Sequence, residues 1–238
     1  MRSAIIVLAA VFLAVAGVFA GETRPKPPEL TVTRLAGAPP KIDGVLDDEA
    51  WKNAARIEQL SRIYGLESET KCRVFITYDD NNLYLAAECP EPEAQMKKLK
   101  AAAKKHDEGK IWEDDEVEFF MDPAGGHGYP YYQIIVNWKG VTLDTFVRQG
   151  TADHDVNWEP KYDMQIAVGK EGWSIELAIP WTAFDRTEKS AAEWNFNFVH
   201  VRSIGELLYW APVYGETSHV PWLFGRLKGM PVRALKAK

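Results

Sequence analysis

IWEDDEVEFFMD, residues Ile111–Asp122, combines a tryptophan, a run of acids and an apolar alternation within twelve residues. From Glu116 onward the side chains alternate between two directions. One set is apolar and suits a core: Val117, Phe119 and Met121. The other set is Glu116, Glu118 and Phe120. A period of two is typical of a β-strand that places one face on a core. The stretch therefore predicts a half-buried strand that begins at Glu116.

Trp112 and the acidic run 113–115 precede this strand, and two interpretations fit them. In the first, the indole stacks on a sugar ring while the acids hold its hydroxyl groups. In the second, they form a solvated acidic turn in front of a core strand, because charged side chains are rarely buried without a partner. The spacing by itself leaves both interpretations open.

Length and composition limit the class of protein. The chain has 238 residues and a net charge of −6, which suits one globular domain. A nucleic-acid partner is disfavoured, because binding to phosphates needs clustered Lys and Arg. The nine tryptophans exceed what a core of this size needs, which leaves room for an aromatic binding surface.

The first twenty residues, Met1–Ala20, have the pattern of a cleaved secretory signal. Arg2 supplies the positive charge, residues 4–17 are apolar, and residues 18–20 form a small-residue cleavage site. The rival interpretation, an uncleaved membrane anchor, needs a somewhat longer apolar run. The sequence therefore predicts a secreted or periplasmic protein that has no membrane partner after cleavage.

The two cysteines flank a predicted hairpin at residues 72–89. If its turn is centred on residues 80 and 81, opposed residues have numbers that sum to 161, which pairs Ile76 with Leu85 and Cys72 with Cys89. Directly opposed residues lie within disulfide range, and export would permit the bond. We therefore expect a Cys72–Cys89 disulfide; the alternative is a pair of free, buried thiols.

Further hairpins follow at residues 131–147 and 162–179, with a strand at 194–202 and closing strands near 209–212 and 223–227. Residues 93–106 are rich in Ala and Lys and predict one inserted helix. The sequence thus predicts an all-β chain folded as an antiparallel β-sandwich with jelly-roll or immunoglobulin-like layering. Its expected divisions are an extended leader at 21–40, the domain at 41–230 and a tail at 231–238.

Seven motifs in a fixed order resemble the family 9 carbohydrate-binding module. They are IDGVLDDEAW, TYDDNNLYLAAE, WEDDEVEFFMDP, YYQIIVNWKG, GWSIELAIPW, WNFNFVHVR and FGRL, and they cover residues 41–228. The resemblance implies a non-catalytic domain with a sugar cleft at one end of the sandwich, where a ring is held between aromatic side chains. It also implies oligosaccharide or polysaccharide partners and an association with other exported glycan-degrading proteins.

The tryptophan and the last glutamate of the family's WxxDxxE-type motif fall on Trp112 and Glu118. The loop 213–223, ahead of the terminal FG motif, would supply the second aromatic side chain, with Tyr214 and Trp222 as candidates. On the middle strand, Gln133 and Asn137 are candidate partners for sugar hydroxyls, in place of a basic residue that the family can carry there. Calcium is common in the family, but its ligands cannot be assigned to particular acids.

Other functions are weaker. A glycosidase would need two carboxylates such as Asp115 and Glu118, but a run of adjacent charges favours solvation over the raised pKa of a general acid. A haem-binding relative would use Met121, which has core parity, and no CxxCH motif is present. An interaction domain that has lost sugar binding also remains open. The histidines show neither HxxH nor HExxH spacing, so no zinc site is expected.

Overall fold

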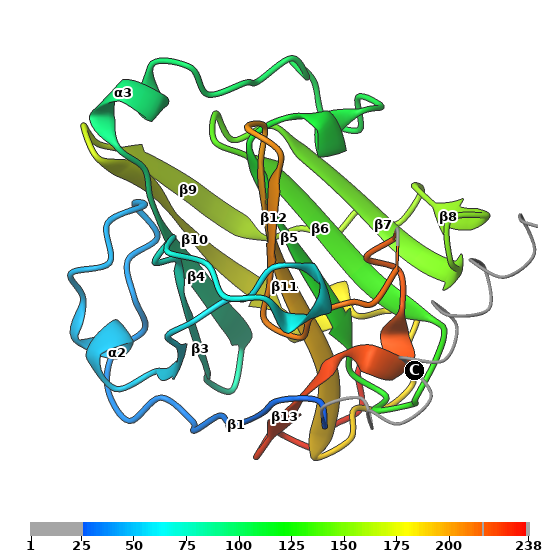
Figure 1. The fold of residues 1–238 in the computed structure, drawn as a ribbon. Helices are drawn as coiled ribbons and strands as arrows, with labels where there is room; N and C mark the ends of the chain where they lie inside the picture. Colours follow the sequence, from blue (N-terminus) through cyan, green and yellow to red (C-terminus); the bar gives the residue numbers. More distant parts are fainter. Residues whose placement is uncertain (1–25, 216, 237–238) are drawn as a thin grey trace, which may run out of the picture.

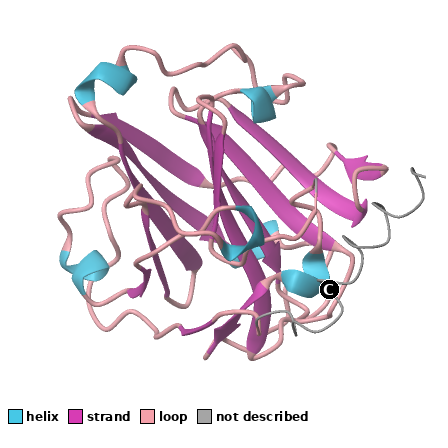
Figure 2. Ribbon diagram, viewed as in Figure 1, coloured by secondary structure: helices cyan, strands magenta, loops and turns pink. Residues whose placement is uncertain are grey.

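The computed structural model describes residues 26–215 and 217–236. The predicted signal peptide, Met1–Ala20, lies outside the described residues. Two β-sheets pack face to face and form a sandwich (Figures 1 and 2), which confirms the predicted fold class. Among the described residues, no helix is both long and apolar enough to cross a membrane.

Eight strands of the described chain make up the larger sheet, on the right in Figure 1. Their order is β1 (Glu29–Thr31), β13 (Gly225–Lys228), β11 (Glu193–Arg202), β5 (Glu116–Asp122), β6 (Tyr131–Asn137), β7 (Thr142–Gln149) and β8 (Asp153–Asp155), while β12 (Glu206–Tyr209) pairs with β11 outside this order. All its neighbouring pairs are antiparallel except β1 with β13.

The smaller sheet has five strands in the described residues. Their order is β2 (Ala55–Ile57), β3 (Arg73–Tyr78), β4 (Asn82–Pro90), β10 (Gly172–Pro180) and β9 (Asp163–Val168). The predicted hairpin register is confirmed, since Ile76 lies opposite Leu85. The hairpins β6–β7 and β9–β10 also form where the sequence predicts them.

The main core lies between the two sheets. Val117, Phe119 and Met121 project into it from β5 as the alternation predicts, and each is fully buried. Fully burying one such side chain contributes about 1.5–3 kcal/mol, so these strands are held mainly by their inner faces. Trp173, Trp181 and Trp194 are buried in this core, and Trp51 is buried in a separate cluster with Phe75 and Tyr84.

The outer face of the larger sheet is covered too, which the period of two does not predict. Phe120 and Tyr131 project from this face and pack with Val213 and Phe224, which come from the segment after β12. As a result every residue of β5 and β6 is buried, including Glu116 and Glu118. The prediction of a strand with one open face is therefore wrong for β5.

The predicted helix 93–106 is largely wrong. Helix α3 spans only Glu93–Met96, and the chain then crosses above the upper ends of the larger sheet as turns and coil (Figure 1). In this coil, backbone N–H groups donate to buried carboxylates: Lys100 N donates to Asp115 and Ala102 N to Asp114, both at 2.6 Å. These tertiary hydrogen bonds replace the i to i−4 bonds that helix propensity favours.

The remaining helical turns are short. They are α2 (Glu49–Lys52) and the 3-10 turns η1 (Ile63–Gly65), η2 (Ile111–Glu113), η3 (Trp181–Ala183) and η4 (Pro221–Leu223).

Residues on both sides of the expected domain boundaries belong to the packed domain. Residues 29–31 of the expected leader form strand β1, and Leu235 of the expected tail is buried in the main core. The sandwich is therefore wider than residues 41–230.

Candidate functional site

A hollow of about 740 Å³ lies on the outer face of the larger sheet and contains three of the predicted site residues, Trp112, Glu118 and Gln133. The register across the sheet sets Glu118 of β5 beside Ile135 of β6, and Ile135 beside Leu143 of β7, so these side chains share one face. The walls come from neighbouring loops and from strands β8 and β12: residues 107, 109, 151, 152, 154, 156, 207 and 217–219 contribute to them. The hollow thus lies over a sheet face, not at the end of the sandwich where the resemblance places a cleft.

Trp112 stands at the edge of this hollow and is 53% exposed. It belongs to the 3-10 turn η2, whose first residue, Ile111, is fully buried and anchors the turn. Because successive residues of a tight turn point in different directions, burial of Ile111 leaves the adjacent indole at the surface. An exposed indole beside a polar floor offers the flat apolar area and the N–H group that suit one face of a pyranose.

Of the three acids after Trp112, Glu113 is exposed, so the interpretation as a solvated turn is wrong for the other two. Asp114 and Asp115 are almost completely buried. Asp115 accepts hydrogen bonds from Ser203 N at 2.9 Å and from the Ser203 hydroxyl, in addition to Lys100 N. Neither acid lines the hollow. They fix the segment that carries Trp112 onto the larger sheet.

Asn137 is also part of this structural network. Its amide donates to Asp114 at 3.1 Å, and its carbonyl oxygen accepts from Lys139 N and Val141 N, each at 3.1 Å. The side chain is fully buried and does not line the hollow. The structure therefore does not bring Asn137 together with the other candidate residues.

Glu118 and Gln133 form the polar floor of the hollow. The Gln133 amide donates to Glu118 Oε2 at 2.6 Å. Burial raises the pKa of Glu118 to about 7, although the hydrogen bond from Gln133 opposes the shift. The adjacent Glu116 is fully buried, and its pKa is raised well above the ordinary value, first by burial and then by the charge of Glu118.

Glu118 does not form a salt bridge with Arg148 or Arg202. Arg148 pairs with Asp153 at 2.9 Å, and Arg202 pairs with Glu91 at 2.6 Å. Within residues 26–215 and 217–236, no basic side chain forms an ion pair with Glu118. Its carboxyl group therefore keeps acceptor capacity for a bound hydroxyl.

Two histidines that were not among the predicted site residues also line the hollow: His154 on β8 and His219 in the loop 213–223. Their rings are 4.9 Å apart and nearly perpendicular. Burial, together with the charge of His154, lowers the pKa of His219 to about 4, so His219 is neutral near pH 7. No spacing motif links the two histidines, because they lie in separate segments that are far apart in the sequence.

The loop 213–223 contributes to the hollow through a different residue from those expected. Tyr214 packs edge-on against Tyr64, at 6.1 Å between ring centroids, and Trp222 is 51% exposed on η4. Neither Tyr214 nor Trp222 lines the hollow. His219 does, and the Tyr129 hydroxyl fixes it by donating to the His219 carbonyl at 2.9 Å.

Among the described residues, two groups of side chains have the spacing to hold a metal ion. One is the exposed set His106, Asp107 and Glu159, and the other is the buried set Cys72, Cys89 and His200. Neither is the all-oxygen set that calcium prefers, so the structure does not identify calcium ligands. The cysteines are free thiols whose sulfur atoms lie 3.8 Å apart. The predicted disulfide is therefore absent from this structure, although the two residues are opposed as expected.

Residues 42–203 match the model of the carbohydrate family 9 binding domain-like family. The chain belongs to this family. Because it is a family of non-catalytic binding modules, the chain is a carbohydrate-binding domain and not an enzyme.

Solved structures of family 9 modules share the fold. A module from Caldicellulosiruptor kristjanssonii in complex with cellotriose is 20% identical, with a TM-score of 0.59 over 85% of this chain and 95% of that one. The same organism's module in complex with glucose is 20% identical, with a TM-score of 0.57 over 83% of this chain and 94% of that one. At this identity the likeness supports the fold alone.

A curated relative is endo-1,4-beta-xylanase A of Thermotoga neapolitana. It is 24% identical over 198 residues, which is 79% of this chain. The match spans 17% of the xylanase, so this chain corresponds to a small part of that protein.

Proposed function

We propose that this family 9 domain binds a sugar ring in the hollow on the larger sheet. The ring stacks on the exposed face of Trp112, and Glu118 and Gln133 hold its hydroxyl groups. The observation that carries the proposal is the convergence of these three residues, from η2, β5 and β6, on one hollow. A flat apolar wall opposite a few convergent polar groups is the usual composition of a small-ligand site.

The volume of the hollow supports a ligand of a few sugar units. At about 740 Å³ it falls within the range of about 300–1,000 Å³ that small-molecule sites occupy. Family members of the same fold were solved with glucose and with cellotriose, which makes glucose-based saccharides the first candidates. Charged acceptors make the stronger hydrogen bonds, so Glu118 is the main polar contact.

His219 takes the place of the second aromatic wall. Its imidazole reaches the hollow from the loop that the resemblance assigned to this role, while Tyr214 and Trp222 do not line it. A neutral imidazole offers a smaller flat face than an indole, and because His219 Nδ1 is hydrogen-bonded to the Tyr131 hydroxyl, Nε2 is the nitrogen left for a sugar hydroxyl. We therefore expect weaker stacking and more hydrogen bonding on this side of the sugar.

Calorimetry of the full chain tests the proposal. Glucose, cellotriose and xylotriose are titrated with and without a chelator, which also tests whether calcium contributes. Saturable binding of at least one sugar at one site per chain is expected. The absence of binding to every sugar would favour an interaction domain that has lost its ligand, and release of reducing ends from a polysaccharide would contradict a non-catalytic role.

We further propose that the domain acts outside the cytoplasm, beside other glycan-degrading proteins, because Met1–Ala20 has the pattern of a signal peptide. Expression of the full-length gene product followed by fractionation and N-terminal sequencing tests this. A mature chain that begins at Gly21 in the periplasm or medium supports export. An intact N-terminus in the cytoplasm contradicts it.

A further inference from the structure

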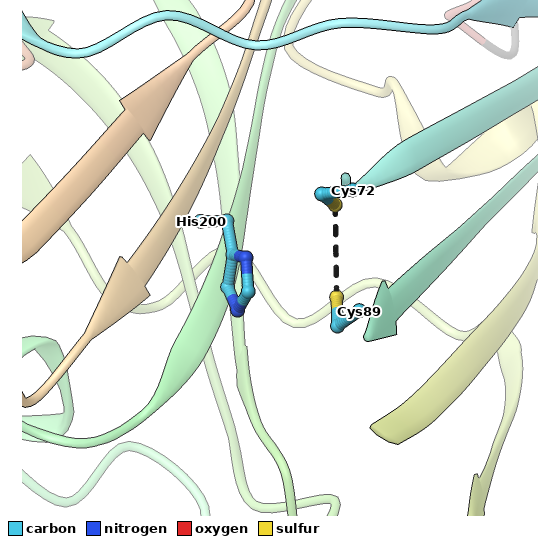
Figure 3. A group of neighbouring side chains, drawn as sticks. All are labelled: Cys72, Cys89 and His200. Carbon is cyan, nitrogen blue, oxygen red and sulfur yellow. Dashed lines mark hydrogen bonds between the residues drawn. The ribbon is translucent and has the colours of Figure 1, made fainter. Parts of the chain in front are cut away.

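The buried group of Cys72, Cys89 and His200 lies inside the sandwich (Figure 3), and none of the three residues lines the sugar hollow. Cys72 immediately precedes β3 and Cys89 is on β4, so both thiols come from the smaller sheet, while His200 comes from β11 of the larger sheet. All three side chains are at most 1% exposed. From these positions we infer that the three residues form a zinc site that joins the two sheets.

The spacing of the sulfur atoms fits shared coordination. Two Zn–S bonds of about 2.3 Å at a tetrahedral angle place the sulfurs about 3.8 Å apart. Cys72 Sγ and Cys89 Sγ are 3.8 Å apart, whereas a disulfide needs a separation of about 2 Å. A tetrahedral Zn–N bond would place the nitrogen about 3.5 Å from each sulfur. A His200 ring nitrogen lies within 4.8 Å of both sulfurs, so a small ring movement completes the geometry.

The state of His200 is the second, independent observation. Neither ring nitrogen has a hydrogen-bond partner among the described residues, although the side chain is fully buried. Buried polar groups are nearly always satisfied, so an unpartnered imidazole among apolar side chains needs an explanation. A bond from one nitrogen to a metal supplies it. The indole N–H of Trp173, whose ring contacts His200 edge-on at 6.1 Å, is also unpartnered and can donate to a thiolate.

Charge selects the metal. Thiolate and imidazole ligands suit thiophilic ions such as Zn²⁺ and Cu⁺. Two thiolates with Zn²⁺ make a neutral group, whereas with Cu⁺ they leave a net negative charge in the core. An uncompensated buried charge is strongly unfavourable, and the ligand set contains no cationic side chain to offset it. The site therefore favours Zn²⁺.

Three protein ligands leave a fourth tetrahedral position, which a water molecule can fill.

Metal titration of the full reduced chain tests the inference. We expect one zinc per chain, and with Co²⁺ as the probe we expect the thiolate charge-transfer and tetrahedral d–d bands. Cys72→Ser and His200→Gln should each remove the bands and the bound zinc. His106→Gln, in the exposed group His106, Asp107 and Glu159, is the matched control and should retain both.

Several outcomes would overturn the zinc site. They are absence of the thiolate bands in the reduced wild-type chain, zinc retained by Cys72→Ser, zinc lost in His106→Gln, and a preference for Cu⁺ in direct competition. A Cys72–Cys89 disulfide in protein isolated from the exporting cell, seen as a mass lower by two hydrogens, would also overturn it. The cobalt spectrum of the wild type keeps the test decisive if a buried variant fails to fold.

Discussion

Replacing Trp112 with alanine removes the stacking surface that the proposed sugar site depends on. Trp112 is 53% exposed, and since a tryptophan presents up to about 250 Å² this leaves about 130 Å² for a ligand. A ring on one face covers about half of it, or about 65 Å², which at about 25 cal/mol per Å² amounts to about 1.6 kcal/mol. Ring geometry adds about 0.5–1.5 kcal/mol. The total of about 2–3 kcal/mol predicts a loss of about 30- to 150-fold in affinity.

The matched control for this variant is Trp222→Ala. Trp222 is 51% exposed, nearly the same fraction, but it does not line the hollow. Calorimetry with the best-binding sugar should therefore show a large loss for Trp112→Ala and a change of less than about threefold for Trp222→Ala. Thermal unfolding of both variants checks that the fold is intact. Equal losses in the two variants, or a larger loss in Trp222→Ala, would refute the assignment of the stacking face.

Four further predictions concern buried charges. Because the pKa of Glu118 is raised to about 7, its carboxylate is protonated and accepts hydrogen bonds less well as the pH falls through that value. Calorimetry should show weaker sugar binding at pH 6 than at pH 8. Glu118→Gln should remove this pH dependence. The pKa of Glu116 is raised well above its unfolded value, so the folded protein binds the proton more strongly and its stability falls as the pH rises. Glu116→Gln should therefore increase the free energy of unfolding at pH 8 and change it little at pH 4. No gain at pH 8 would contradict this sign. Asp115→Ala removes three hydrogen bonds to a buried carboxylate and should lower the free energy of unfolding, measured in urea, by about 3 kcal/mol. Amide exchange near residue 100 should become faster. Unchanged exchange there would contradict the prediction. Glu91→Ala leaves Arg202 without its bidentate partner and should cost about 3 kcal/mol, so a loss below about 1 kcal/mol would show that the pair is not essential.

The candidate site was partly predictable from the sequence. Trp112 and Glu118 lie six residues apart, and one turn followed by one strand brings them to the same hollow, which a local motif can capture. Gln133 follows because it lies on the neighbouring strand with outward parity. His154 and His219 had no such signal, since one lies on the edge strand β8 and the other in a distant loop, and only the tertiary fold brings them together.

Asn137 shows the limit of parity arguments. It has the same parity as Gln133 on β6, yet its amide group is already hydrogen-bonded to Asp114 and to two backbone N–H groups. Parity assigns a side chain to a face of the sheet but does not say what covers that face at each position.

By itself the sequence determined the strands, their hairpin registers and the inner face of each sheet, because alternation and turn residues act over a few positions. Three features depended on tertiary contacts. They are the burial of the outer face of β5 and β6, the absence of helix from residues 97–106, and the proximity of Cys72, Cys89 and His200. The physical reason is that each of these requires groups from separate strands or loops. Asp114 and Asp115 attract the N–H groups of a segment that would otherwise be helical, and the thiols meet the imidazole only when the two sheets pack face to face.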